Sequence, residues 1–109
     1  MAKLPCISYL KALADESRWQ IVRAVLERPR TVNELAEALG VSQYNISKHL
    51  RILRAADIIE SERQGKHIVS RINPRLRNDV KEGELAINLG CCRFSFDDSP
   101  DFRAFSLPG

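Results

Sequence analysis

A chain of 109 residues, 44% of them hydrophobic, suits one soluble domain. Its three cysteines lack the C-x-x-C spacing that is typical of zinc ribbons and thioredoxin-like proteins. Residues 1–81 carry 15 Lys and Arg against 9 Asp and Glu, a balance compatible with a polyanionic partner and also with an ordinary solvated surface. No apolar run approaches the roughly 20 residues that cross a bilayer. The first residues also lack the apolar stretch of a secretory signal, so we expect a cytoplasmic protein that does not contact a membrane.

Two helices are predicted in the first 30 residues. Apolar side chains recur at helical spacing over residues 4–14 and again from Trp19 to Leu26. Between the two stripes, Asp15 is a residue type that favours helix N-caps. Pro29 is expected to end the second helix.

A pair of helices separated by a short turn is predicted next. Thr31 and Glu34 fit a capping box, in which each side chain accepts a hydrogen bond from an otherwise free backbone N–H. Gly40 is the residue type that commonly ends a helix in a left-handed conformation, and Ser42 is a good N-cap for a helix over residues 42–56. The apolar side of that second helix consists of Ile46, Leu50 and Leu53. This order predicts a helix-turn-helix.

The periodicity then changes to that of strands. Residues 58–62 and 67–72 read as two short strands, with Gly65 available for the tight turn between them. Pro74 is expected to end this hairpin, which follows the helix pair directly and therefore resembles a wing.

The C-terminal third has weaker patterns. Residues 75–89 show a faint helical spacing that contains Gly83, whereas residues 91–96 alternate like a strand. If that strand forms, Cys92, Phe94 and Phe96 share one side of it. Residues 97–109 contain two prolines and a glycine and are expected to be loose.

Together these elements predict an α+β, mainly α fold: a winged helix-turn-helix with a two-stranded hairpin and flanking N- and C-terminal helices. Residues 1–89 are expected to form one domain. Residues 90–109 form a partly flexible extension that contains two of the cysteines.

The outer side of the helix over residues 42–56 combines hydrogen-bond donors, acceptors and positive charge. Glutamine can pair with adenine, and arginine or lysine with guanine, at base edges in the major groove, while Lys48 and Arg51 could equally contact phosphates. A basic hairpin tip can enter a minor groove or follow phosphates. An ordinary wet helix face and a solvated turn are the alternatives. The residues concerned are Gln43, Tyr44, Ser47, Lys48 and Arg51 on the helix, and Arg63, Gln64 and Lys66 on the hairpin.

Three segments resemble the ArsR/SmtB family of winged-helix repressors: LADESRWQIV at residues 13–22, TVNELA at residues 31–36 and VSQYNISKHLRIL at residues 41–53. The resemblance covers about residues 8–72. It implies a homodimer on a palindromic operator in duplex DNA, with repression relieved by an effector, so residues 1–89 are expected to be a DNA-binding and dimerisation domain with dimerisation helices at both ends. We expect no cofactor to be required for DNA binding. It also implies DNA contacts at Ser42, Gln43, Tyr44, Ser47, His49 and Arg51, with the wing at residues 63–67. Because His49 lies off the main outward face, a phosphate contact or a packed structural histidine is expected there.

The cysteines are the candidate effector ligands. The family's usual metal positions are not filled, because residues 32–39 contain no cysteine and residues 75–89 contain no histidine. What remains is Cys6, Cys91 and Cys92, whose thiolates are soft ligands that select thiophilic ions. Some family members resemble this chain in using adjacent C-terminal cysteines for arsenite.

Since the family's dimer packs N- and C-terminal helices together, Cys6 could approach the pair, also from the other subunit. We therefore expect As(III) or a comparable thiophilic ion as the effector. Two alternatives stay open: buried structural cysteines, and a redox switch in which a bridge to Cys6 is easier than one between adjacent cysteines.

Other functions have less support. A winged-helix protein-interaction module that has lost DNA binding is opposed by the basic side chains at Lys48, Arg51, Arg63 and Lys66. An enzyme is not expected, because the sequence shows no paired acid and base, no Ser/His/Asp order and no phosphate-binding loop.

Overall fold

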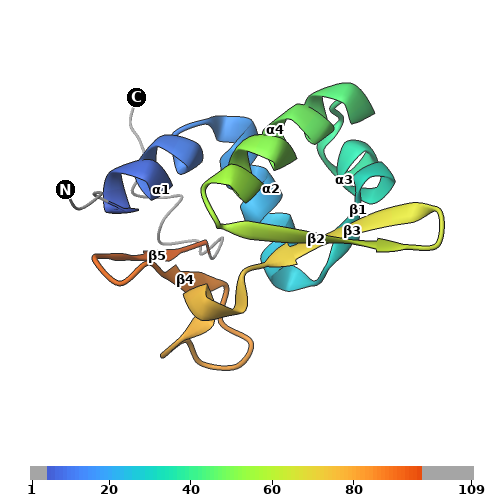
Figure 1. Cartoon of the computed structure of the whole chain (residues 1–109). Coiled ribbons are helices and arrows are strands. Elements are labelled where there is room, and N and C mark those ends of the chain that lie inside the picture. The colour runs from blue at the N-terminus through green and yellow to red at the C-terminus, as the bar shows by residue number, and fades with distance from the viewer. Residues whose placement is uncertain (1–4, 97–109) are drawn as a thin grey trace, which may run out of the picture.

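Figure 1 shows the computed structural model of the chain, which describes residues 5–96. In chain order the elements are α1 (Pro5–Leu13), α2 (Glu16–Glu27), β1 (Arg30–Thr31), α3 (Val32–Leu39), α4 (Gln43–Ala55), β2 (Ile59–Gln64), β3 (His67–Ile72), a 3-10 helix (Pro74–Arg77), β4 (Ala86–Asn88) and β5 (Arg93–Ser95). No helix in residues 5–96 is long and apolar enough to cross a membrane.

The predicted helix caps are present. The Asp15 carboxylate accepts a 3.0 Å hydrogen bond from the backbone N–H of Arg18, so α2 begins where the sequence indicated. At the start of α3 the Thr31 hydroxyl accepts from the Glu34 N–H at 3.1 Å, and the Glu34 carboxylate accepts from the Thr31 N–H at 2.9 Å. The hydrogen bond from the Thr31 N–H is the main reason that the pKa of Glu34 lies below its ordinary value.

The turn between α3 and α4 also follows the prediction. Gly40 has φ of 67°, a left-handed conformation that glycine adopts without steric cost, and its N–H bonds back to the Ala36 carbonyl. The Ser42 hydroxyl then accepts a 3.1 Å hydrogen bond from the Asn45 N–H and starts α4. The helix-turn-helix is thereby confirmed.

The wing is a three-stranded antiparallel sheet rather than a simple hairpin. β2 and β3 pair in register from Ile59 opposite Ile72 to Gln64 opposite His67, and Gly65 has φ of 64° in the two-residue turn. β1 adds to the other edge of β3, giving the order β1-β3-β2. The sequence did not reveal β1, because two residues are too few to show a periodicity.

The helix expected over residues 75–89 does not form. This segment contains instead the 3-10 helix, a loop and β4, which pairs with β5. Asp79 and Gly83 have φ of 62° and 85°, conformations that an α-helix cannot contain. The strand predicted within residues 91–96 is confirmed as β5. The loose conformation expected for residues 97–109 lies outside the described residues, and a domain division at residue 90 stays a prediction.

One apolar core joins α2, the helix pair, the wing and the second hairpin. Its fully buried side chains include Ile21, Val22, Leu35, Ile46, Leu50, Leu53, Ile58, Ile59 and Ile87. The second hairpin adds an aromatic contact, because the Phe96 ring stacks on Trp19 with centroids 4.1 Å apart and Phe94 meets the same indole edge-on. Burying each large aliphatic side chain contributes about 1.5–3 kcal/mol. The core therefore holds α4 by one side and leaves its other side open.

Candidate nucleic-acid interface and cysteine cluster

The inner side of α4 is fixed and its outer side is open. Leu50 is 1% exposed, and Ile46 and Leu53 are fully buried, whereas the Tyr44 side chain is 74% exposed. Apart from His49, all the predicted DNA-contact residues on and before this helix lie at the surface: Ser42, Gln43, Tyr44, Ser47, Lys48 and Arg51. The structure thus brings these side chains together on one solvent-facing surface, which we call the α4 outer face.

Within the α4 outer face, Lys48 lies one helical turn after Tyr44. Its Nζ atom is 5.8 Å from the centre of the Tyr44 ring, within the range of a cation–π interaction. At an exposed site such a contact contributes about 0.5–1 kcal/mol. It orders two long side chains that would otherwise lose more freedom on meeting a ligand.

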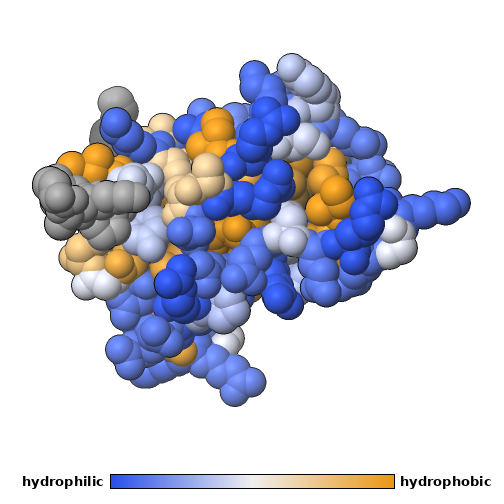
Figure 2. All heavy atoms as spheres, viewed as in Figure 1, coloured by the Kyte–Doolittle hydropathy of each residue, from blue (hydrophilic) through white to orange (hydrophobic). Residues whose placement is uncertain are grey.

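The wing tip carries the remaining predicted contacts. Arg63, Gln64 and Lys66 are all exposed around the turn at Gly65. The wing reaches away from the body of the protein at the right of Figures 1 and 2, where hydrophilic side chains cover it.

The wing is also tied to α4. The Arg54 guanidinium donates to the Ser61 hydroxyl at 3.3 Å, and Ser61 is hydrogen-bonded at 3.0 Å to Ser70, which is fully buried. These bonds connect the last turn of α4 to neighbouring positions on β2 and β3. The orientation of the wing relative to α4 is therefore set by both the core and a polar contact.

The cations of the α4 outer face and the wing tip differ from those elsewhere. Many other arginines of the described chain have carboxylate partners, as in the 2.7 Å pair of Arg30 with Glu27 and the 2.8 Å pair of Arg93 with Glu84. Within residues 5–96, no ion pair involves Lys48, Arg51, Arg63 or Lys66. Their positive charge is thus left for an external anion.

His49 is placed differently from the other predicted DNA contacts. Its side chain is half-buried, and its Nδ1 atom lies 3.2 Å from an Arg18 guanidinium nitrogen. Arg18 also donates its backbone N–H to Asp15, and this hydrogen bond is the main cause that lowers the pKa of the Asp15 carboxyl. Sequence reasoning did not single out Arg18, because no local pattern indicates a contact between residues 31 positions apart.

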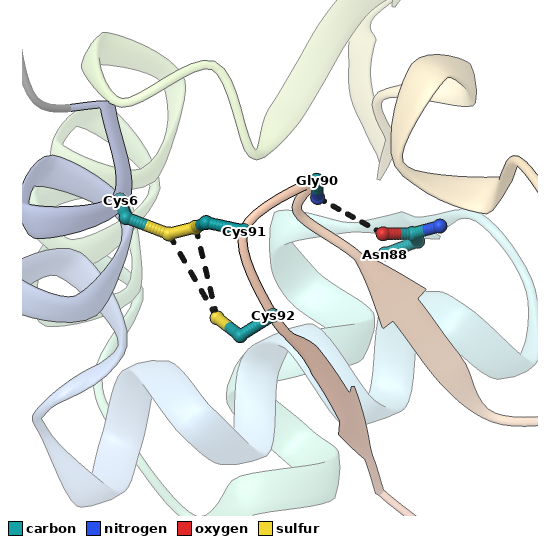
Figure 3. Close-up of a disulfide and its surroundings, with 5 residues drawn as sticks. All are labelled: Cys6, Asn88, Gly90, Cys91 and Cys92. Atoms are coloured by element: carbon teal, nitrogen blue, oxygen red, sulfur yellow. Dashed lines mark hydrogen bonds between the residues drawn. A yellow bond between two sulfur atoms is a disulfide. The ribbon is translucent and has the colours of Figure 1, made fainter.

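The three cysteines meet within one chain (Figure 3). Cys6 lies in the first turn of α1, while Cys91 and Cys92 lie in the loop between β4 and β5. A disulfide joins Cys6 to Cys91, whose Cα atoms are 6.3 Å apart, and the Cys92 sulfur is 3.8 Å from each of their sulfurs. The approach of Cys6 to the cysteine pair is as predicted, and it occurs within a single chain, with the pair in the loop that leads into β5.

The loop that presents the cysteine pair is tightly held. Gly90 has φ of 92°, its N–H donates to the Asn88 side chain at 2.9 Å, and the Leu89 N–H donates to the Cys92 carbonyl at 2.9 Å. Cys91 is exposed, whereas Cys92 is half-buried and packs against the core on the same side as Phe94 and Phe96. The predicted alternation is confirmed.

Three sulfur atoms within 4.8 Å of one another form a set of soft ligands, which favours thiophilic ions over hard cations. The same proximity permits disulfide chemistry, since a thiolate can attack a neighbouring sulfur only at close range. The geometry is thus compatible with both the ion-binding and the redox interpretations of these cysteines.

Comparison with known proteins agrees with this geometry. The model for "Bacterial regulatory protein, arsR family" matches residues 15–61. The chain is 43% identical over 63 residues to the HTH-type transcriptional repressor SmtB of Mycobacterium tuberculosis, and the match covers 58% of this chain and 47% of the relative. The chain thus spans about half the length of that relative. It is 35% identical over 85 residues to the arsenical resistance operon repressor of Bacillus subtilis, covering 77% of this chain and 76% of the relative.

Solved structures share the fold. Reduced HlyU from Vibrio cholerae superposes with a TM-score of 0.61 at 29% identity, covering 62% of this chain and 72% of that one. A solution structure from Mycobacterium bovis, described as a homodimeric winged helix-turn-helix DNA-binding domain, gives the same TM-score and identity and covers 63% of this chain and 64% of that one. The winged helix-turn-helix architecture is therefore confirmed, and the relatives are transcriptional regulators rather than enzymes.

Proposed function

Since this chain belongs to the ArsR family of bacterial regulatory proteins, we propose that it is a homodimeric repressor that binds a specific operator in duplex DNA and is released by a thiophilic effector. Arsenite is the effector that the cysteine cluster favours. Such a regulator acts in the cytoplasm, where the chromosome lies. The observation that carries the proposal is the α4 outer face, which combines exposed polar side chains with cations that form no ion pair with any carboxylate in residues 5–96.

Each part of the α4 outer face has a role that follows from its chemistry. Gln43 and Arg51 have the donor and acceptor patterns that distinguish adenine and guanine in the major groove. Lys48, a point charge on a flexible stem, suits a phosphate. With α4 in the major groove, the wing tip at Arg63 and Lys66 is available for a neighbouring minor groove or its phosphates.

The dimer part of the proposal rests on α1. Ile7 and Leu10 are 48% and 43% exposed, although they are large and apolar and belong to one helix. In Figure 2, apolar residues reach the surface at the α1 end of the molecule. A second copy of this chain would cover these side chains, and burial of this kind helps a protein whose own core is small.

The arsenite part of the proposal rests on the cysteine cluster. Three reduced thiols and As(OH)₃ give a pyramidal As(SR)₃ centre and three waters, so each As–O bond is replaced by an As–S bond. Cys6, Cys91 and Cys92 supply the three sulfurs from a single chain once a dithiol reductant has converted the Cys6–Cys91 bridge to two thiols and has itself been oxidised to a disulfide. Two of the relatives are arsenical resistance operon repressors, of Bacillus subtilis and Escherichia coli.

A redox response is the second candidate, and the Cys6–Cys91 disulfide favours it. A hydroperoxide would oxidise the two thiols to the bridge and be reduced to an alcohol and water. Cys92 is not part of that bridge, so it distinguishes the two effectors.

DNA binding is tested by fluorescence anisotropy with reduced protein. The probe is the duplex immediately upstream of the protein's own gene, and the control is a scrambled duplex of equal composition. We expect tighter binding to the upstream duplex at every salt concentration, with affinity for both falling as salt rises. Equal affinity for the two duplexes would contradict sequence-specific repression.

The effector is tested with cysteine variants bound to that duplex. Arsenite should release the wild type and the control variant Ser8→Ala, but not Cys6→Ser, Cys91→Ser or Cys92→Ser. Hydroperoxide should still act on Cys92→Ser, which keeps both sulfurs of the bridge. Release of all three cysteine variants by arsenite would remove the cluster as the effector site.

A further inference from the structure

One side chain links the helix that carries Cys6 to the helix that carries the α4 outer face. The Arg18 guanidinium, in the first turn of α2, donates through Nε to the Ala12 carbonyl at 2.6 Å, in the last turn of α1. Another of its nitrogens lies 3.2 Å from His49 Nδ1 on α4. Three helices therefore meet at a single planar cation with a fixed hydrogen-bond geometry.

This contact selects the tautomer of a neutral His49 ring. A guanidinium has donors and no acceptor, so Nδ1 of His49 must provide the lone pair. A neutral imidazole that accepts at Nδ1 carries its proton on Nε2. Arg18 thus leaves Nε2–H as the ring's donor, which is the form of histidine that can donate to a phosphate oxygen.

α1 is fastened at both ends. Its first turn is bonded through Cys6 to the β4–β5 loop, and its last turn is bonded through the Ala12 carbonyl to Arg18. A helix of nine residues is about 13 Å long and moves as a rigid body on this scale. α1 therefore connects the cysteine cluster at one end to Arg18 at the other.

The junction of α1 with α4 is open on its solvent side. A surface depression of about 400 Å³ lies beside Arg18 and is lined in part by Lys11 of α1 and by Ile52 and Ala55 of α4. Beneath it, Ala12 and Leu13 of α1 are buried in the core. Arg18 lines the depression, so its contacts with α1 and α4 lie at the partly open side of the junction.

We propose that Arg18 is a positioning residue that transmits the bonding state of the cysteine cluster to His49 and so to the α4 outer face. The inference rests on the proposed function for its last step, the effect on DNA. When Cys6 changes between a disulfide, a free thiol and an arsenic ligand, α1 shifts against the β4–β5 loop. The hydrogen bond from Arg18 to Ala12 carries that shift to the guanidinium, and His49 loses or regains its partner.

The first experiment reads His49 directly and needs no DNA. Long-range ¹H–¹⁵N correlation spectra of the ¹⁵N-labelled chain, recorded at pH 8, report which nitrogen of each neutral histidine is protonated. The chain has two histidines, and the exposed His67 in the wing is an internal control. Spectra are compared for the disulfide form, the reduced form and the reduced form with sodium arsenite.

For the wild type we expect His49 in the Nε2–H form with Nδ1 accepting, and His67 as a mixture of tautomers. The Nδ1 shift of His49 should differ between the forms of the cluster, while His67 stays unchanged. In Arg18→Met, and in the second variant Arg18→Lys should the first not fold, His49 should resemble His67 and no longer respond. Identical His49 signals in all three wild-type forms, with thiol counts showing that the cluster has changed, would overturn the proposal.

The second experiment measures the coupling to DNA. Arsenite should weaken the operator affinity of the wild type by a factor in the typical range of about 5–150. Arg18→Met should bring this factor close to one, while Arg28→Met, at the exposed end of the same helix, should leave it unchanged. An undiminished factor in Arg18→Met would refute the transmission, whereas a wild type that binds no operator would refute the proposed function and leave the histidine result to decide the role of Arg18.

Discussion

Substitutions at two neighbouring residues of α4, Leu50 and Arg51, should affect different properties: one the stability of the fold, the other the affinity for DNA. Leu50 is 1% exposed, and replacing a buried leucine with alanine typically costs about 2–5 kcal/mol. That is a large part of the roughly 5–15 kcal/mol that stabilises a domain. Arg51 is exposed and makes no ion pair with any described residue, so Arg51→Ala should change the free energy of unfolding by no more than about 0.5 kcal/mol.

For operator affinity we expect the opposite ranking, with Arg51→Ala more damaging than Leu50→Ala. An arginine that contacts guanine through two hydrogen bonds contributes about 1–3 kcal/mol, so Arg51→Ala should weaken operator binding by roughly 5- to 150-fold. Leu50→Ala changes no side chain of the α4 outer face, and its folded fraction should bind the operator with nearly wild-type affinity.

Two assays measure this pair of effects. Urea unfolding followed by fluorescence of Trp19, the single tryptophan, gives the free energies of unfolding, and anisotropy gives the affinities. The reasoning is refuted if Arg51→Ala destabilises the fold as much as Leu50→Ala does. It is equally refuted if Arg51→Ala binds the operator as tightly as the wild type at moderate salt.

Further predictions concern the caps and the wing. Thr31→Ala should lower stability by about 1 kcal/mol in thermal unfolding, because the Glu34 N–H loses its acceptor, while Thr31→Ser should lose little. The pKa of folded Glu34 lies below its unfolded value, so its contribution is complete above the unfolded pKa and is lost as pH falls through the folded one. In urea unfolding between pH 7 and pH 3, Glu34→Gln should therefore lose less stability than the wild type, and an equal loss would contradict this. Gly65→Ala should cost about 1–2 kcal/mol in thermal unfolding, because φ is 64°, and Gly65→Asn should cost less.

The caps and periodicities of the first 72 residues were predictable because they depend on local interactions. Asp15, Thr31 and Ser42 accept hydrogen bonds from backbone groups three positions away, and the residue types that do so are few. The apolar stripe of α4 likewise predicts which side of the helix is buried. The solvent exposure of Ser47, Lys48 and Arg51 follows from that stripe, so the sequence was enough to predict it.

The helix predicted over residues 75–89 was wrong for the opposite reason. Between residues 75 and 89 the apolar side chains are too sparse to select a helix, and the left-handed conformation of Asp79 has no sequence signal as strong as a glycine. The strand β1 exists because β3, nearly 40 positions later, supplies its hydrogen bonds. Short strands of this kind are products of tertiary contact.

In the candidate sites, too, local patterns were predictable and contacts between distant residues were not. The cysteines could be identified as candidate ligands from their chemistry. The contact between Cys6 and Cys92, however, joins residues 86 positions apart and depends on the β4–β5 hairpin. The contact of Arg18 with His49 is similarly non-local. Sequence patterns identified the side chains, while the packing of α1, α2 and the hairpin determined which of them meet.

Amide chemical-shift mapping of the ¹⁵N-labelled protein with the upstream duplex tests most directly whether α4 reads DNA. The account predicts that the largest shifts fall on Gln43, Ser47 and Arg51 and on the wing tip from Arg63 to Lys66, with small shifts on α1. A duplex that shifts α1 or the β4–β5 loop instead, and leaves the α4 outer face unperturbed, would contradict it.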